Sequence, residues 1–121
     1  MSAQGPISLT VSPVAYTVIA ETANSDSARA FSDWLLNGHI ADVIRAGALS
    51  GSLVRIDTGD SQIYRFEVRY MFASDAAFRA YEAGPAASLR AEGIALFGPD
   101  SEHHVHFERT LGTVLNDSVR G

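Results

Sequence analysis

Two histidines near the C-terminus have a spacing that is typical of metal ligands. On a β-strand, His104 and His106 would share one face about 7 Å apart, so that both imidazoles could meet one ion. Glu108 follows on that face but would lie about 13 Å from His104, so a third ligand such as Glu67 would have to come from another element. Structural zinc normally takes four ligands. We therefore predict no metal, and histidines that are solvated or contact a partner chain.

His39 is a second candidate for chemistry. It lies four residues after Leu35 and four before Val43, on the apolar stripe of a predicted helix. With an ordinary pKa near ~6.5, an imidazole in a pocket between helix and sheet can act as an acid or a base. Trp34 and Tyr81 would line the same pocket. A histidine on such a stripe is more often structural, and we favour that interpretation while keeping the pocket as the alternative.

Three arginines could form an anion site, because a guanidinium group binds a carboxylate through two parallel hydrogen bonds. They are Arg55, Arg65 and Arg69, and the glutamates expected beside them favour ion pairs within the chain instead. The sequence contains no phosphate loop, nucleophile elbow, HExxH motif or calcium loop. Catalytic residues are therefore left unassigned, and no cofactor is predicted.

The elements that must position these residues alternate between strands and helices. Capping residues, glycines and prolines mark their ends. We predict strands at Val14–Glu21, Leu49–Asp57, Gln62–Phe72 and His104–Leu111, one helix from Ser25 to Ala46 interrupted at Gly38, and a helical segment from Asp75 to Phe97 broken at Gly84-Pro85.

This βαββαβ order predicts an α+β, ferredoxin-like fold. The sheet would be antiparallel, with strand order 4-1-3-2 and both helices on one face. Alternation in the third strand places Tyr64 and every second residue up to Phe72 under the helices. A three-residue hairpin at Thr58-Gly59-Asp60 would place Val54 and Ile56 on that side too.

The opposite sheet face is expected to be uncovered and mixed in character. Its apolar members would be Ile19, Leu53, Ile63 and Met71. Its polar members, which form a candidate interface or ligand face, would be Arg55, Arg65, Glu67, Arg69, His104, His106 and Glu108. Monomers rarely expose such apolar area, so we predict a two-fold homodimer through this face. A solvated face and a ligand site remain alternatives.

Composition limits the classes of partner. The 121 residues fit one domain at 13–112 between flexible ends at 1–12 and 113–121. A net charge of −5 argues against nucleic-acid binding, and no apolar run approaches the roughly 20 residues of a membrane helix. The absence of cysteine excludes disulfides and thiol chemistry, and it is compatible with a cytoplasmic location. We see no signal peptide.

Residues 13–111 resemble the dimeric α+β barrel superfamily. The resemblance rests on the helix with Trp34 and His39, the hairpin into RFEVRYMF and the segment AFRAYEAGPAASLRAEGIALFG. It is closest to a small bacterial family of unknown function with a similar stretch. The resemblance implies a ferredoxin-like protomer whose sheet packs against that of a second copy. The superfamily includes monooxygenases, polyketide cyclases and structural proteins, and no catalytic residue of theirs matches a position here.

Three functions therefore remain open. The leading one is a non-catalytic, dimeric ferredoxin-like protein. The second is a small-molecule-binding protein or enzyme, monooxygenase- or cyclase-like, that uses a pocket near Trp34, His39 and Tyr81. The third is a metal-binding module at His104 and His106. The number of polar groups that converge on a pocket separates the first two, and the sequence shows few.

Overall fold

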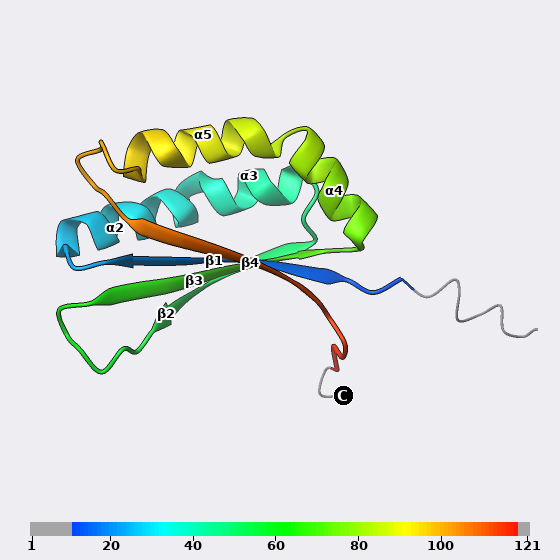
Figure 1. Ribbon diagram of the computed structural model, residues 1–121, viewed down its shortest axis with the longest axis horizontal. Coiled ribbons are helices and arrows are strands. Elements are labelled where there is room, and N and C mark those ends of the chain that lie inside the picture. Colours follow the sequence, from blue (N-terminus) through cyan, green and yellow to red (C-terminus); the bar gives the residue numbers. More distant parts are fainter. Residues whose placement is uncertain (1–10, 119–121) are drawn as a thin grey trace, which may run out of the picture.

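A computed structural model describes residues 11–118 as a sheet of four strands with helices on one face (Figure 1). The elements follow the predicted order. They are β1 (Val14–Thr22), α2 (Ser25–Trp34), the π-helical segment η1 (Leu35–His39), α3 (Ile40–Arg45), β2 (Ser50–Ile56), β3 (Tyr64–Phe72), α4 (Asp75–Ala83), α5 (Ala86–Phe97) and β4 (His106–Thr113).

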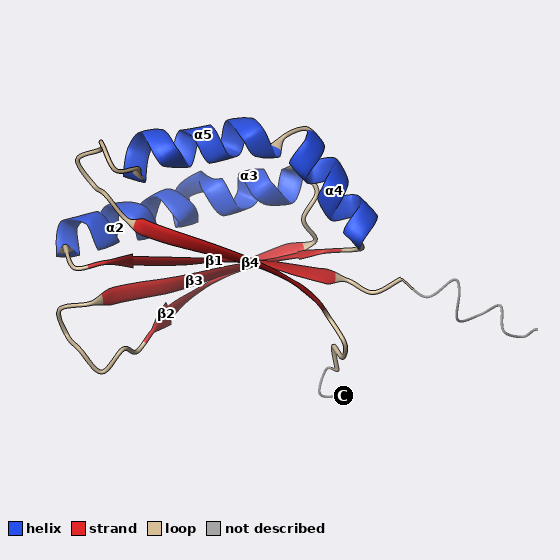
Figure 2. Ribbon diagram, viewed as in Figure 1, coloured by secondary structure: helices blue, strands red, loops and turns tan. Residues whose placement is uncertain are grey.

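The sheet has the order β2-β3-β1-β4, and all neighbouring strands are antiparallel. Figure 2 shows the helices together on one side of it and the other side bare. The predicted architecture is confirmed in class, strand order and layering. Most of the predicted flexible N-terminal end and the last three residues of the C-terminal end lie outside the described residues, while Thr113 is the last residue of β4. The division of the chain stays a prediction.

Two helices begin after a residue whose side chain caps the first turn. The side chain of Asn24 accepts a hydrogen bond from the backbone N–H of Ser27 at 2.9 Å, and the Ser74 hydroxyl accepts one from Ala77 at 3.0 Å. Each cap satisfies a backbone donor that the first turn of a helix leaves free. These caps fix where α2 and α4 begin and so how their apolar sides face the sheet.

Aromatic side chains occupy most of the space between the sheet and the helices. Phe31 of α2 is central among them, with its ring edge-on to Phe97 at a centroid distance of 5.3 Å. The sheet contributes buried rings at alternate positions, as predicted, and the helices contribute the rest: Tyr16, Phe66, Tyr70 and Phe72 from below, and Phe31, Phe78, Tyr81 and Phe97 from above. Tight packing of this kind makes the inner face of each strand unambiguous.

The predicted register of β2 is wrong. Leu53 pairs with Val68 and Val54 with Glu67, so Leu53 and Arg55 face the helices while Val54 and Ile56 face outward. The reason is the turn, which spans residues 57–63 and not three residues. Side chains within it bond to nearby N–H groups, from Gly59 to Asp57 at 2.9 Å and from Gln62 to Asp60 at 2.9 Å. A shift in register by an odd number of residues moves every side chain of a strand to the opposite face of the sheet.

The last strand also begins later than predicted, at His106 and not at His104. Val105 is 2% exposed, and its N–H donates to the carbonyl of Phe97 at 3.0 Å. This hydrogen bond and the burial of Val105 attach the link between α5 and β4 to the core before β4 begins. His104 therefore belongs to the link.

Candidate functional site

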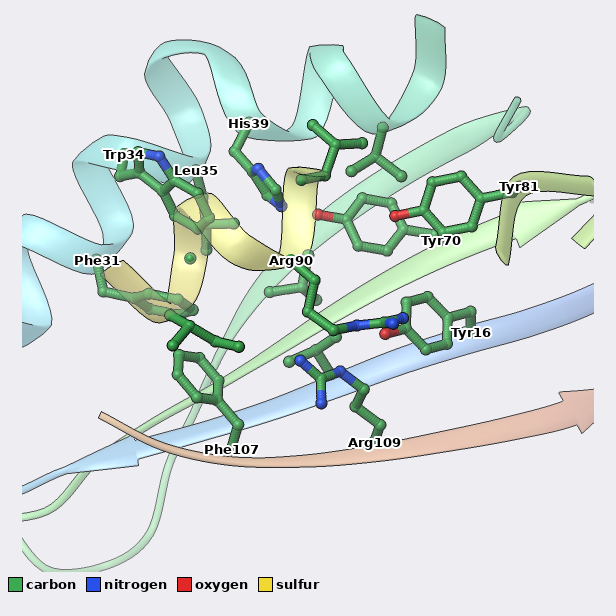
Figure 3. Close-up of a pocket in the computed structure, with 16 residues that line it drawn as sticks. Tyr16, Phe31, Trp34, Leu35, His39, Tyr70, Tyr81, Arg90, Phe107 and Arg109 are labelled. Atoms are coloured by element: carbon green, nitrogen blue, oxygen red, sulfur yellow. The ribbon is translucent and has the colours of Figure 1, made fainter. Parts of the chain in front are cut away.

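A cavity of about 80 Å³ lies between the sheet and the helices (Figure 3). We call its mouth the side lined by the half-exposed Arg90 of α5 and the exposed Arg109 of β4. Its walls come from α2, η1, α3, α4, α5 and three strands. The polar side chains on it are Tyr16, His39, Tyr70, Tyr81, Arg90 and Arg109, and the others are Val18, Phe31, Trp34, Leu35, Val43, Val68, Leu89, Gly93, Ile94 and Phe107. The three residues predicted for a pocket, Trp34, His39 and Tyr81, all line it.

Trp34 and His39 stack face to face on the helical wall. Their ring centroids are 3.9 Å apart and the planes differ by 20°. Residues five apart would point about 140° away from each other on an α-helix. Here the N–H of Ile40 bonds to the carbonyl of Leu35, which is the five-residue repeat of a π turn. The π turn therefore aligns the indole with the imidazole.

The side chain of His39 is enclosed, but one of its ring nitrogens lacks a hydrogen bond to residues 11–118. Its side chain is 13% exposed, and its buried Nδ1 has no hydrogen-bond partner within the described part of the chain. The nearest carboxylate oxygen belongs to Glu92 on α5, 3.9 Å away. Burial lowers the pKa of His39, against opposing effects of Glu92 and Asp42. The ring is thus mainly neutral at pH 7 and can accept or donate one hydrogen bond.

Tyrosine hydroxyls form the neighbouring part of the wall. Tyr70 and Tyr81 point toward the His39 side of the cavity (Figure 3). Burial raises the pKa of Tyr70 and, with smaller effects of nearby charges, raises that of Tyr81 to about 12. Both phenols therefore stay protonated and can donate hydrogen bonds at neutral pH.

Two arginines that the sequence analysis did not select face the cavity (Figure 3). Arg90 of α5 pairs with Glu82 at 2.7 Å, and hydrogen bonds to Glu82 and Tyr16 raise the pKa of Arg90. Arg109 of β4 takes part in none of the ion pairs found within residues 11–118. The alternation of β4 could have identified Arg109, because a strand that turns Phe107 inward must turn the second residue after it inward too.

The candidate interface residues are partly brought together on the bare face of the sheet. Strand pairing places Arg65, Glu67, Arg69, His106 and Glu108 there. Arg65 bonds through Nε to Glu21 at 2.8 Å, and Arg69 lies 3.4 Å from a carboxylate oxygen of Glu67. Two of the three candidate arginines, Arg65 and Arg69, thus form ion pairs within the chain, as the sequence analysis favoured.

Arg55 and His104 do not belong to that face. Arg55 faces the helix side, with its guanidinium carbon 5.5 Å from the centre of the Tyr64 ring. His104 is exposed in the link before β4, so it does not share a strand face with His106. Across residues 11–118, no three His, Asp or Glu side chains gather closely enough to hold a metal ion.

Comparison with solved structures identifies the architecture. A dimeric ferredoxin-like protein from an uncultured marine organism superimposes with a TM-score of 0.70 at 14% identity, over 88% of this chain and 99% of that one. The chain has the ferredoxin-like α+β fold. A second dimeric ferredoxin-like protein from an uncultured marine organism gives a TM-score of 0.62 at 8% identity, over 89% and 99% of the two chains.

A protein of unknown function from Nitrosomonas europaea gives a TM-score of 0.57 at 19% identity, over 92% of this chain and 97% of its own. No protein-family model and no curated protein matches the chain. The expected resemblance to ferredoxin-like proteins is therefore confirmed at the level of the fold. In the described region, no helix is both long enough and apolar enough to cross a membrane.

Proposed function

We propose that this ferredoxin-like protein binds a small molecule in the cavity between its sheet and its helices. The observation that carries the proposal is His39, which lines the cavity and whose buried Nδ1 has no hydrogen-bond partner within residues 11–118. An unsatisfied buried polar atom costs about 1–3 kcal/mol, and a bound ligand can supply the missing hydrogen bond. Binding alone accounts for this arrangement, which is consistent with a non-catalytic protein.

The convergence of polar groups supports the same conclusion. Ligand sites are mostly apolar pockets with a few polar groups that fix the ligand's orientation. Here aromatic walls surround one imidazole, three buried phenols and two guanidinium groups. The sequence showed few such groups because Arg90 and Arg109 come from different elements and meet the histidine only after folding.

Trp34 gives a direct test, because it is the single tryptophan of the chain and lies on the cavity wall. Native mass spectrometry of the purified protein is expected to show a retained small molecule. After its removal, at least one of phenol, 3-methylbutanamide and 3-methylbutanoate is expected to change the Trp34 emission saturably.

A cavity-filling variant, Val18→Phe, should abolish that saturable change, since Val18 is half-buried against the cavity. The matched substitution Val11→Phe, at an exposed position that precedes β1 and does not line the cavity, should leave it intact. A wild-type protein that retains no molecule and responds to none of the three probes would contradict the proposal.

The second part of the proposal is a homodimer through the bare sheet face. Ile19, Val54, Ile56 and Met71 lie on this face among the ion pairs of Arg65 and Arg69. Val54 and Ile56 take the place that the sequence analysis gave to Leu53. The two marine proteins with this fold are described as dimeric, which supports the same state here.

A bacterial, cytoplasmic setting completes the proposal. It is supported by a chain without cysteine, which suits a reducing compartment. The division into one domain at 13–112 with flexible ends is part of the same proposal, and the strands and helices between Val14 and Thr113 are consistent with it.

A further inference from the structure

We infer that the ligand of this cavity is a small monocarboxylate with a compact apolar body. The carboxylate would lie between Arg90 and Arg109 at the mouth, and the body would extend toward the stacked Trp34 and His39 (Figure 3). This inference rests on the proposed function and specifies the chemistry of its ligand.

The guanidinium groups at the mouth of the cavity favour a ligand with a negative group. Arg90 and Arg109 bring two positive charges to the cavity, and Glu82, which pairs with Arg90, brings one negative charge. Arg109 has no ion-pair partner within residues 11–118. A carboxylate placed there would pair with Arg109, and its two oxygens match the parallel N–H groups of a guanidinium.

The other polar groups disfavour a cationic ligand. Among the described residues, the cavity wall includes no Asp or Glu side chain. Burial keeps Tyr81 protonated, with a pKa of about 12, and keeps His39 mainly neutral. An ammonium group inside would therefore meet no carboxylate from residues 11–118 on the cavity wall. An uncharged head group would lack the charge-assisted hydrogen bonds that a carboxylate can accept from Arg109.

The size of the cavity limits the apolar body. A closed cavity of about 150 Å³ holds benzene in a protein core. The cavity here measures about 80 Å³ and is walled by Phe31, Leu35 and Phe107. A branched chain of about four carbons fits that smaller scale when its head group remains at the mouth. We therefore take 3-methylbutanoate as the probe.

The experiment titrates the full chain with 3-methylbutanoate, 3-methylbutanamide, 3-methylbutylamine and inorganic phosphate, following Trp34 emission and confirming binding by calorimetry. The carboxylate is expected to bind saturably. The amide is expected to bind at least about tenfold more weakly, because it loses the charge-assisted hydrogen bonds. The amine and phosphate are expected to give no saturable response.

Arg109→Met should weaken carboxylate binding by about tenfold or more. Because Arg109 is exposed, this change should leave the thermal unfolding temperature of the unliganded protein unaltered. The matched control is Arg79→Met, since Arg79 lies exposed on α4 and pairs with Asp75 away from the cavity. It should bind the carboxylate as the wild type does.

Equal affinity for carboxylate and amide would overturn the inference while leaving the proposed function standing. So would binding of the amine or of phosphate in preference to the carboxylate, or full carboxylate affinity in Arg109→Met. A carboxylate that does not bind at all would also overturn it. In that case a retained molecule, or a saturable response to phenol, still supports the cavity as a binding site.

Discussion

At the scale of single residues, the proton on His39 links the cavity to the stability of the fold. Burial lowers the pKa of this imidazole below its value of 6.5 in an unfolded chain. Between the two pKa values the unfolded chain binds the proton and the folded one does not, so stability increases with pH there. His39 thus contributes a loss of stability as the pH falls below about 6.5.

We expect His39→Gln to reduce the pH dependence of unfolding. Between pH 7.5 and pH 5.5, the wild type should lose more stability than the variant, as measured by urea unfolding at each pH. His104→Gln is the matched control, since His104 is exposed in the link before β4. Emission from Trp34 should report the same event, because a protonated imidazole quenches a stacked indole.

The emission titration of the wild type should therefore give a midpoint below 6.5, and this transition should be missing from His39→Gln. A midpoint above 6.5, or identical pH dependence of unfolding in wild type and His39→Gln, would show that burial does not control this imidazole.

At the scale of elements, the sequence pattern located the strands and helices but not their exact registration. The alternation in β3 is strong enough to place Phe66, Val68 and Tyr70 in the core. The polar turn that follows β2 has no equally clear pattern, so the sequence did not show its length. Its side-chain hydrogen bonds belong to a turn longer than predicted, and Leu53 and Arg55 therefore lie on the opposite face from the predicted one. Turn length decides strand faces, and the composition of a turn does not fix its length.

The helix carrying His39 shows a second limit of pattern reading. The spacing of Leu35 and His39 suits one face of an α-helix, yet the π turn pairs Leu35 with Ile40 and Trp34 with His39. The pocket prediction named the right residues, but their contact depends on a turn that a period of 3.6 residues does not describe. Arg90 was missed because its partner Glu82 lies on another helix.

Deletion of Asn37 tests the π turn. A π turn accommodates one extra residue in a helix, and Asn37 lies exposed within η1. Removing it makes Trp34 and His39 neighbours four apart, which share a face of a regular α-helix. The deletion should therefore keep the pH-dependent quenching of Trp34 and shift the unfolding temperature by only a few degrees.

Deletion of Ala41, in the regular helix α3, is the comparison and should be far more damaging, because it rotates Val43 by about 100° out of the core. If removal of Asn37 abolished the quenching, or if both deletions were equally harmful, the role assigned to the π turn would be wrong.

At the scale of the whole molecule, helices cover one face of the sheet and the other face is bare, where we propose the dimer interface. Ile19 lies near the middle of the bare face, paired with Glu67 on one side and Glu108 on the other. In a two-fold dimer the same patch meets itself, so a charge introduced there is repeated across the interface. The two glutamates would stabilise an arginine at this position within a single chain.

Ile19→Arg is therefore expected to separate the dimer without unfolding the protomer. Light scattering coupled to size-exclusion chromatography should give twice the chain mass of 12.9 kDa for the wild type and the single mass for the variant. Leu36→Arg is the matched control, because Leu36 is 66% exposed on the helical side. It should remain dimeric, and a wild type of single mass at micromolar concentration would contradict the interface.

The alternation of β1 gives the molecule a further property. Tyr16 and Val18 reach the cavity, while Thr17 and Ile19 lie on the bare face, so one strand separates the two surfaces by its own thickness. Any free energy by which a ligand favours association must equal the free energy by which association favours the ligand. Dilution shifts a dimer toward single chains. The change in apparent ligand affinity across a dilution series therefore measures the coupling between the cavity and the bare face.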